Sequence, residues 1–270
     1  MTSAADRWRQ SLDAWALPED ILAVAEESPW ILPTAIFQVP EFIATSPSHE
    51  RARAALPTGG TVLDVGCGGG VAAFALTPPA SHVIGVDLRA DMLSMFKDNA
   101  AKYRVDCQII EGLWPAVADS TPSADVVTAH HVVYNVGDIG PFLRALDDHA
   151  RFRVVLELPD CHPLSTMSEA WRYFWQLERP EGPTASDLVD VLEELGVEAH
   201  RDQWCGAMRR EQGLDQAAHF TRTRLCLPSS REDDVRDFLA RQPDSSERDM
   251  STIWWDTLTS DEARLKSAAL

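Results

Sequence analysis

A glycine-rich stretch beginning at residue 66 constrains the fold of this chain more than any other feature of its sequence. It follows the aliphatic run Thr61–Val65, whose β-branched composition is typical of a buried parallel strand. Four glycines fall within residues 66–70, and residues 71–76 offer a short helix. A loop without Cβ atoms lets a ligand approach the backbone, and the start of a helix presents free N–H groups. The pattern therefore predicts a ligand-binding loop at the carboxyl end of the first strand of an α/β sheet.

A second aliphatic run, residues 82–87, predicts another strand of the same sheet. It ends on Asp87, 17 residues after Gly70. An acidic side chain at that point can accept hydrogen bonds from the hydroxyl groups of a ribose. The glycine loop and this acid together predict a nucleoside-containing cofactor at the sheet edge.

The segment Asp64-Val65-Gly66-Cys67-Gly68-Gly69-Gly70 resembles the first motif of the class I S-adenosylmethionine-dependent methyltransferases, Asp/Glu-x-Gly-x-Gly-x-Gly. Asp87 matches the ribose-binding acid of that family, and the resemblance extends more loosely to about residue 160. It implies a Rossmann-like α/β fold with helices on both faces of a seven-stranded, mostly parallel sheet whose last strand is antiparallel. It also implies S-adenosylmethionine as cofactor and S-adenosylhomocysteine as product.

The resemblance implies a set of cofactor contacts. Asp64 is expected near the amino group of the methionine part, and Met92 against the adenine. Family members often carry Gly-Asp after the third strand, whereas this chain has Gly112-Leu113-Trp114, so we expect Leu113 or its backbone N–H to line the adenine pocket instead. The residues expected to bind the cofactor are Asp64, Gly66, Cys67, Gly68, Gly70, Asp87, Leu88, Met92, Gly112, Leu113 and His130.

Other functions share parts of this pattern. A P-loop needs Lys-Ser/Thr after its glycines, which Gly70-Val71-Ala72 lacks. A dinucleotide-binding loop of the form G-x-G-x-x-A does fit residues 68–73, so an NAD(P)-binding oxidoreductase remains an alternative. Asp64 argues against the oxidoreductase, because dinucleotide-binding folds normally place an apolar residue at that position. The alternative role for Asp64 is purely structural, as a helix or turn cap. A protein that binds S-adenosylmethionine for regulation, or for another transfer reaction, also remains open.

Methyl transfer from a sulfonium is a direct displacement, so the protein mainly aligns the nucleophile and excludes water. A hydroxyl or amine nucleophile benefits from a general base. The predicted fourth strand ends in His130 and His131, at the sheet edge that also carries the glycine loop. We expect His130, His131 or the nearby Tyr134 to be catalytic, with Glu157 and His162 as further candidates. The alternative is one buried, hydrogen-bonded histidine beside an exposed one.

Three regions are expected along the chain. Residues 1–50, rich in Trp and Phe, are predicted to form a helical lid, or else simply to pack on the core. Residues 51–228 are the predicted Rossmann-like core, and residues 229–270 a helical extension. Within the core, Thr221–Leu227 is predicted to be the seventh strand, and Ser186 the N-cap of a helix that runs to Leu195.

Composition narrows the acceptor and the partners. The 24 Lys and Arg residues against 42 Asp and Glu give a formal charge of −18, which argues against extended contact with a nucleic-acid backbone. No Asn/Asp-Pro-Pro-Tyr/Phe motif and no acid-acid-Asn metal set can be placed. We therefore expect an O or N atom of a small organic molecule as acceptor, with no metal, nucleic acid or membrane partner. Five separated cysteines and the lack of a long apolar run favour the cytoplasm. The sequence predicts no oligomeric state.

Overall fold

The computed structural model describes residues 2–30, 34–207, 213–243 and 247–257. Seven strands form one sheet in the order β3-β2-β1-β4-β5-β7-β6. They are β1 (Thr61–Val65), β2 (His82–Asp87), β3 (Asp106–Glu111), β4 (Ala124–His130), β5 (Ala150–Pro159), β6 (His200–Ala207) and β7 (Glu247–Asp256). β7 is antiparallel to both of its neighbours, and β1 to β5 pair in parallel. The predicted fold class is therefore confirmed.

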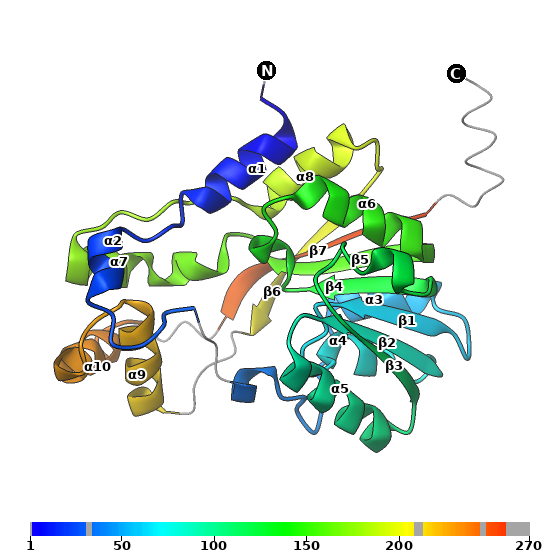
Figure 1. The fold of residues 1–270 in the computed structure, drawn as a ribbon, viewed down its shortest axis with the longest axis horizontal. Helices are drawn as coiled ribbons and strands as arrows, with labels where there is room; N and C mark the ends of the chain where they lie inside the picture. The colour runs from blue at the N-terminus through cyan, green and yellow to red at the C-terminus, as the bar shows by residue number, and fades with distance from the viewer. Residues whose placement is uncertain (1, 31–33, 208–212, 244–246, 258–270) are drawn as a thin grey trace.

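Helices cover both faces of the sheet (Figure 1). Val62 and Leu63 are adjacent in β1 and belong to different hydrophobic clusters, because successive strand residues point to opposite faces. The cluster of Val62 includes α3 (Pro47–Ala55), α4 (Val71–Phe74) and α5 (Ala90–Tyr103). The cluster of Leu63 includes α1 (Ala4–Asp13), α6 (Ile139–His149) and α8 (Ala185–Glu194).

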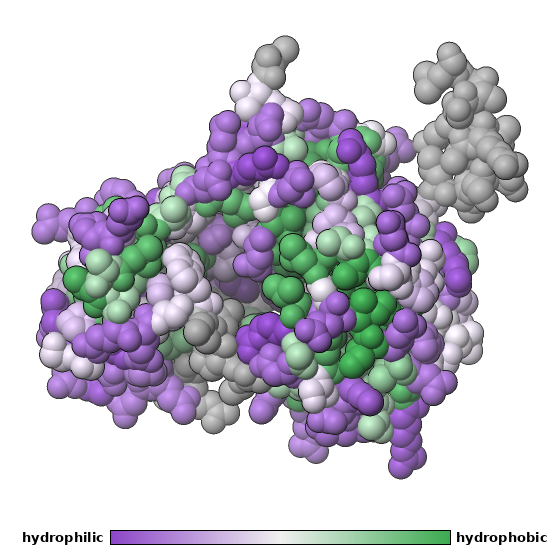
Figure 2. Space-filling view, viewed as in Figure 1, coloured by the Kyte–Doolittle hydropathy of each residue, from purple (hydrophilic) through white to green (hydrophobic). Residues whose placement is uncertain are grey.

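A third hydrophobic cluster lies beside the sheet, on the left in Figure 1. It joins α2 (Glu19–Ala23), α7 (Ser168–Trp175), α9 (Leu214–Arg224) and α10 (Glu232–Ala240) through Ile21, Trp171, Ala218 and Phe238 among others. We call these four helices the cap. Figure 2 shows the surface hollowed between the cap and the half of the molecule that carries the sheet. Short 3-10 turns connect the elements: η1 (Thr34–Phe37), η2 (Ala118–Ser120), η3 (Val133–Asn135), η4 (Pro163–Met167) and η5 (Ser229–Arg231).

The seventh strand lies elsewhere than the sequence predicted. The stretch Thr221–Leu227 begins inside α9, whose buried residues Ala218 and Arg222 are four positions apart, the spacing of a helix and not of a strand. The seventh strand is β7, within residues 229–270 that were predicted to be a helical extension. It is inserted between β5 and β6, which explains why most of its second half is buried.

The helix predicted to have Ser186 as its N-cap is α8, and its N-cap lies two residues earlier. Its N-cap is Thr184 and not Ser186: the Thr184 side chain accepts from the Asp187 N–H, and the Asp187 carboxylate accepts from the Thr184 N–H. This reciprocal capping box satisfies two backbone donors at once. Ser186 instead accepts a hydrogen bond from Arg201.

Candidate active site

The glycine loop between β1 and α4 has a backbone that favours glycine. Gly66, Gly68 and Gly70 have φ angles of +70°, +49° and +94°. A Cβ atom on Gly66 would lie 2.5 Å from Val132, and one on Gly70 would lie 2.2 Å from the Phe74 ring. Backbone conformation therefore favours glycine at all three positions, and lack of space also requires it at Gly66 and Gly70.

Asp87 joins this loop to the end of β2. Its carboxylate accepts hydrogen bonds from the backbone N–H of Gly68 at 3.0 Å and of Arg89 at 2.9 Å. Each carboxylate oxygen has more than one acceptor position, so both can still bind a ligand hydroxyl. Asp87 thus stabilises the loop and presents acceptors beside it.

Exposed apolar side chains follow the ends of the two neighbouring strands β2 and β3. Leu88 is 64% and Leu113 is 62% exposed. Gly112 donates its N–H to the Asp87 carbonyl oxygen at 3.0 Å, and a Cβ on Gly112 would lie 2.2 Å from Val117. A flat apolar ligand such as adenine could cover these leucines, which are otherwise open to water.

Asp64 carries a polar atom without a partner. The residue is 1% exposed; its Oδ1 accepts from the Thr128 hydroxyl at 3.1 Å, and Oδ2 is buried with no hydrogen-bond partner in the described structure. Burial raises the pKa of Asp64 to about 7, although the hydrogen bond from Thr128 opposes the shift. A cationic donor such as an ammonium group fits this carboxylate, so the residues suit the expected cofactor.

Two of the residues predicted to contact the cofactor turn their side chains into the core. Met92 is 1% and Cys67 is 6% exposed, and burial raises the pKa of the Cys67 thiol well above its ordinary value. The Cys67 N–H donates to the Val86 carbonyl oxygen at 3.0 Å. Cys67 is therefore placed to shape the loop, and an adenine contact by Met92 stays a prediction.

The N-terminal region reaches the glycine loop through Phe37 of η1. A Cβ on Gly69 would lie 2.2 Å from the Phe37 carbonyl oxygen, and one on Gly68 would lie 3.4 Å from the Phe37 ring. The Arg89 guanidinium lies 5.8 Å from the centre of the same ring. Part of the predicted lid thus covers the outer side of the loop.

His131 and Glu157 pair at the ends of β4 and β5, next to the strand that carries the loop. Nε2 of His131 lies 3.2 Å from Oε1 of Glu157, and the His131 side chain is 48% exposed. His131 has a φ of +61°, a strained value for a residue with a side chain. Its backbone N–H donates to the Glu157 carbonyl oxygen at 2.7 Å, and this bond helps to hold the turn.

His130 also lies against the Glu157 carboxylate, but it is largely closed to solvent. Its side chain is 9% exposed and its Nδ1 lies 4.0 Å from Oε2 of Glu157. Its Nε2 is buried without a hydrogen-bond partner in the described structure. Burial lowers the pKa of His130 to about 3, against the attraction of Glu157. His130 is therefore neutral near pH 7, whereas His131 is the accessible histidine.

Two residues at the start of α3 complete this cluster. Ser46 donates its hydroxyl hydrogen to Oε2 of Glu157 at 2.6 Å, and the Ser46 N–H donates to Nδ1 of His49 at 3.1 Å. Burial alone would raise the pKa of Glu157, but the attraction of His130 and hydrogen bonds from His131 and Ser46 keep it well below its usual range. The sequence reasoning missed Ser46 and His49. The only signal was a serine before Pro47, the pattern of a helix N-cap.

Tyr134 lies against the other face of the sheet. Its hydroxyl donates to the Pro159 carbonyl oxygen at 2.7 Å, and its ring stacks on Trp8 with centroids 5.6 Å apart. The residue is 5% exposed, and burial raises the pKa of its hydroxyl. The structure thus gives Tyr134 a packing contact and separates it from the His131–Glu157 pair.

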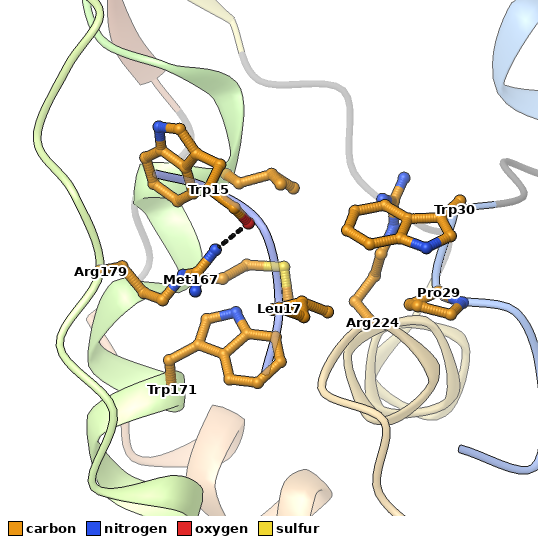
Figure 3. A pocket seen from close by; sticks show the side chains of 9 residues that line it. Trp15, Leu17, Pro29, Trp30, Met167, Trp171, Arg179 and Arg224 are labelled. Carbon is orange, nitrogen blue, oxygen red and sulfur yellow. Dashed lines mark hydrogen bonds between the residues drawn. The ribbon is translucent and has the colours of Figure 1, made fainter. Parts of the chain in front are cut away.

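The tryptophans of the N-terminal region meet the cap at a small pocket (Figure 3). Trp15 and Trp30 face Met167 and Trp171 there, and Arg179 donates to the Trp15 carbonyl oxygen. The open volume is about 10 Å³, room for a single water molecule. This contact is therefore a packed seam between the N-terminal region and the cap.

Two kinds of feature are absent from the described part of the chain. No three His, Cys, Asp or Glu side chains are arranged there to bind a metal ion. No helix there is long and apolar enough to cross a bilayer.

Part of the chain is similar to known methyltransferases. A family model described as "Methyltransferase domain" matches residues 62–151. Ribosomal protein L11 methyltransferase of Vibrio cholerae is 31% identical over 157 residues, which are 58% of this chain and 46% of that protein. Ubiquinone biosynthesis O-methyltransferase of Azorhizobium caulinodans is 34% identical over 83 residues, which are 31% of this chain and 33% of that protein. The chain thus spans less than half the length of these relatives.

A solved structure shares the fold over most of both chains. It is a SAM-dependent methyltransferase from Thiobacillus denitrificans in complex with S-adenosyl-L-homocysteine, with a TM-score of 0.50 and 15% identity, covering 82% of this chain and 95% of that one. The family match and the fold confirm the predicted resemblance. Residues 62–151 match a methyltransferase domain, and the sheet around them has the fold of the class I S-adenosylmethionine-dependent enzymes.

Proposed function

We propose that this chain, which carries a class I S-adenosylmethionine-dependent methyltransferase domain, methylates an O or N atom of a small organic molecule. The observation that carries the proposal is the accessible His131–Glu157 pair. It lies at the same sheet edge as the glycine loop, because β4 and β5 follow β1 in the sheet order. We place the reaction in the cytoplasm, without a nucleic-acid or membrane partner, on the grounds of charge and composition.

Six residues of the site would hold the cofactor. The unpartnered Oδ2 of Asp64 would bind the ammonium group, Gly66 and Gly68 would border the methionine and ribose parts, and Asp87 would accept from the ribose hydroxyls. Leu113, together with Leu88, would cover the adenine. When bound, S-adenosylmethionine supplies a methyl group on a positively charged sulfur.

His131 is the proposed general base. Its Nε2 faces the Glu157 carboxylate, which as an acceptor requires the proton to be on Nε2. Nδ1 then carries the lone pair, and it can take the proton from an acceptor hydroxyl or ammonium group. The resulting imidazolium is stabilised by Glu157, whose other oxygen is fixed by Ser46. Glu157 and Ser46 therefore act as positioning residues for His131.

A small acceptor is favoured by the charge of the chain and by one relative. The formal charge of −18 disfavours long contacts with a nucleic acid. The Azorhizobium relative is named an O-methyltransferase of ubiquinone biosynthesis, whereas the Vibrio relative is named for a ribosomal protein. A protein acceptor is therefore the competing outcome of an acceptor screen.

The test begins with calorimetric titration of the protein with S-adenosylhomocysteine and, separately, NAD. Micromolar binding of S-adenosylhomocysteine that Asp87→Ala abolishes, and that the exposed control Asp98→Ala retains, is expected. Turnover is then followed as S-adenosylhomocysteine release with phenols, aliphatic hydroxyls, amines and ribosomal protein. Binding of NAD alone would overturn the cofactor assignment, and turnover with protein alone would overturn the small acceptor.

A further inference from the structure

Arg248, near the start of β7, is a cation with no counter-ion in the described structure. Its Nε is buried and has no hydrogen-bond partner, and no described carboxylate lies within ion-pair distance of its guanidinium. Burial lowers the pKa of Arg248, although the attraction of Glu157 and Tyr134 opposes this. Arg248 as a whole is half-buried, and a buried N–H without a partner costs free energy. The position of Arg248 is therefore suited to binding an anionic ligand.

The register of the sheet puts Arg248 at the acceptor edge. In the antiparallel pairing of β5 with β7, Glu157 is opposite Thr252 and Pro159 is opposite Met250. Arg248 is two residues before Met250, so it lies beyond the carboxyl end of β5. Because side chains alternate along a strand, Arg248, Met250 and Thr252 share the face of Glu157.

Glu157 is close enough to attract Arg248 but does not pair with it. Oε1 of Glu157 interacts with His131 and Oε2 accepts from Ser46. The carboxylate is thus already engaged by the proposed base and its support. The Arg248 guanidinium therefore lies near the proposed reaction site, and Glu157 accepts none of its hydrogen bonds.

An indole lies beside Arg248 on the neighbouring strand. Arg248 is paired with Gly206 of β6, and Trp204 is paired with Met250. A Cβ on Gly206 would lie 2.8 Å from the Trp204 ring, so the missing side chain makes room for that ring. The Trp204 Nε1–H donates to the Thr252 hydroxyl at 3.1 Å, which fixes the ring. Cation and aromatic ring are therefore neighbours on one face.

We propose that Arg248 binds the carboxylate of the methyl acceptor, and that Trp204 packs against the acceptor's aromatic ring. The acceptor is then a small aromatic carboxylic acid that carries a hydroxyl or amino group. A guanidinium matches a carboxylate through two parallel N–H···O bonds, which makes it selective for this group. The inference rests on the proposed methyl transfer and adds the substrate class.

The cofactor's own carboxylate is the competing anion. β7 lies three strands from β1 in the sheet, a separation of about 14 Å at about 4.8 Å per strand. The glycine loop that follows β1 would hold the methionine part, so Arg248 belongs to the acceptor's side. Affinity for S-adenosylhomocysteine therefore separates the two assignments.

The experiment compares hydroxy- and aminobenzoates with their neutral carboxamides, titrated into protein saturated with S-adenosylhomocysteine. Wild type is expected to bind the carboxylates at least tenfold more tightly than the carboxamides. Arg248→Met should remove this preference, Arg248→Lys should keep part of it, and the exposed control Arg241→Met should keep all of it. Affinity for S-adenosylhomocysteine should be unchanged in all three variants.

Thermal stability gives a second test, because replacing a half-buried cation whose Nε has no partner should not destabilise the fold. Arg248→Met is therefore expected to melt at or above the temperature of wild type. The proposal is overturned if wild type shows no preference for carboxylates, if Arg248→Met keeps the preference, or if that variant loses affinity for S-adenosylhomocysteine. Wild type that binds no S-adenosylhomocysteine at all would instead contradict the proposed function. The wild-type comparison remains decisive even if Arg248→Met does not fold.

Discussion

His131 is joined to Glu157 twice: the backbone N–H of His131 donates to the Glu157 carbonyl oxygen at 2.7 Å, and its Nε2 lies 3.2 Å from the Glu157 carboxylate. The first contact comes with the left-handed turn at His131, and the second orients the imidazole. Together they leave Nδ1 as the nitrogen available to an acceptor. A half-exposed ring on a doubly fixed residue is suited to proton transfer, because little reorganisation is needed when an acceptor arrives.

Replacement of His131 by Asn should lower kcat by about 10² to 10⁴-fold, the usual contribution of a positioned general base. Glu157→Gln should lower kcat by a smaller factor, because it weakens the stabilisation of the His131 imidazolium without removing the base. Affinity for S-adenosylhomocysteine should stay the same in both. Steady-state kinetics with calorimetry checks this, with the exposed His200→Asn as control. Unchanged kcat in His131→Asn would exclude His131 as the base.

Asp64 should make stability depend on pH. Its pKa is about 7 in the folded protein against an ordinary 3.8. Between these values the folded protein keeps a proton that the unfolded chain has lost, so this group's stabilising contribution, complete below pH 3.8, falls as pH rises and is lost above about 7. Asp64→Asn has no carboxyl group to ionise, so it does not lose stability in this way. Its free energy of unfolding, relative to wild type, should rise by up to about 4 kcal/mol across the range, measured by urea denaturation. A constant difference would contradict the shift.

Affinity for S-adenosylhomocysteine should follow the same ionisation. The charged carboxylate of Asp64 attracts the ligand's ammonium group, so affinity in wild type should increase as pH rises through about 7. Asp64→Asn should bind more weakly and without this increase. Calorimetry at several pH values measures both proteins. An equal pH dependence in the two would place the titrating group elsewhere.

Tyr134→Phe should leave kcat within a factor of about two, because the hydroxyl already donates to Pro159 and lies apart from His131. Loss of that hydrogen bond should cost about 1 kcal/mol of unfolding free energy. Kinetics and thermal unfolding of the same preparation give both values. A large fall in kcat with unchanged stability would restore the catalytic role that the sequence predicted for Tyr134.

Arg222 of α9 should fix the segment around Glu27, which follows α2, to α9 and α10. It is 2% exposed and forms ion pairs with Glu27 of the N-terminal region and Glu232 of α10. Arg222→Met should lower the unfolding free energy by about 2 kcal/mol and speed proteolysis within residues 19–30. Arg231→Met, which removes an exposed ion pair between η5 and α10, is the control. Equal proteolysis of the two variants would show that Arg222 does not hold this region.

Local patterns in the sequence were sufficient for the cofactor half of the fold. The strand–loop–helix unit around Gly66, and Asp87 at the end of the next strand, are specified by residues close together in the chain. Steric rules and strand periodicity therefore identify them without knowledge of the remainder. The end of β4 at His130 was predicted in the same way.

Only the tertiary structure decided the other half of the fold, which contains β7 and the proposed acceptor site. Residues 221–227 have an alternating pattern that suits a strand, yet residues 221–224 form the end of α9, and β7 occupies the sheet instead. Ser46 meets Glu157 across 111 positions of the chain. Arg248 reaches the acceptor edge only because β7 is inserted beside β5. The sequence alone determined the cofactor loop, because its constraints are local. The proposed acceptor site was decided by packing between distant segments, whose pairing no local pattern records.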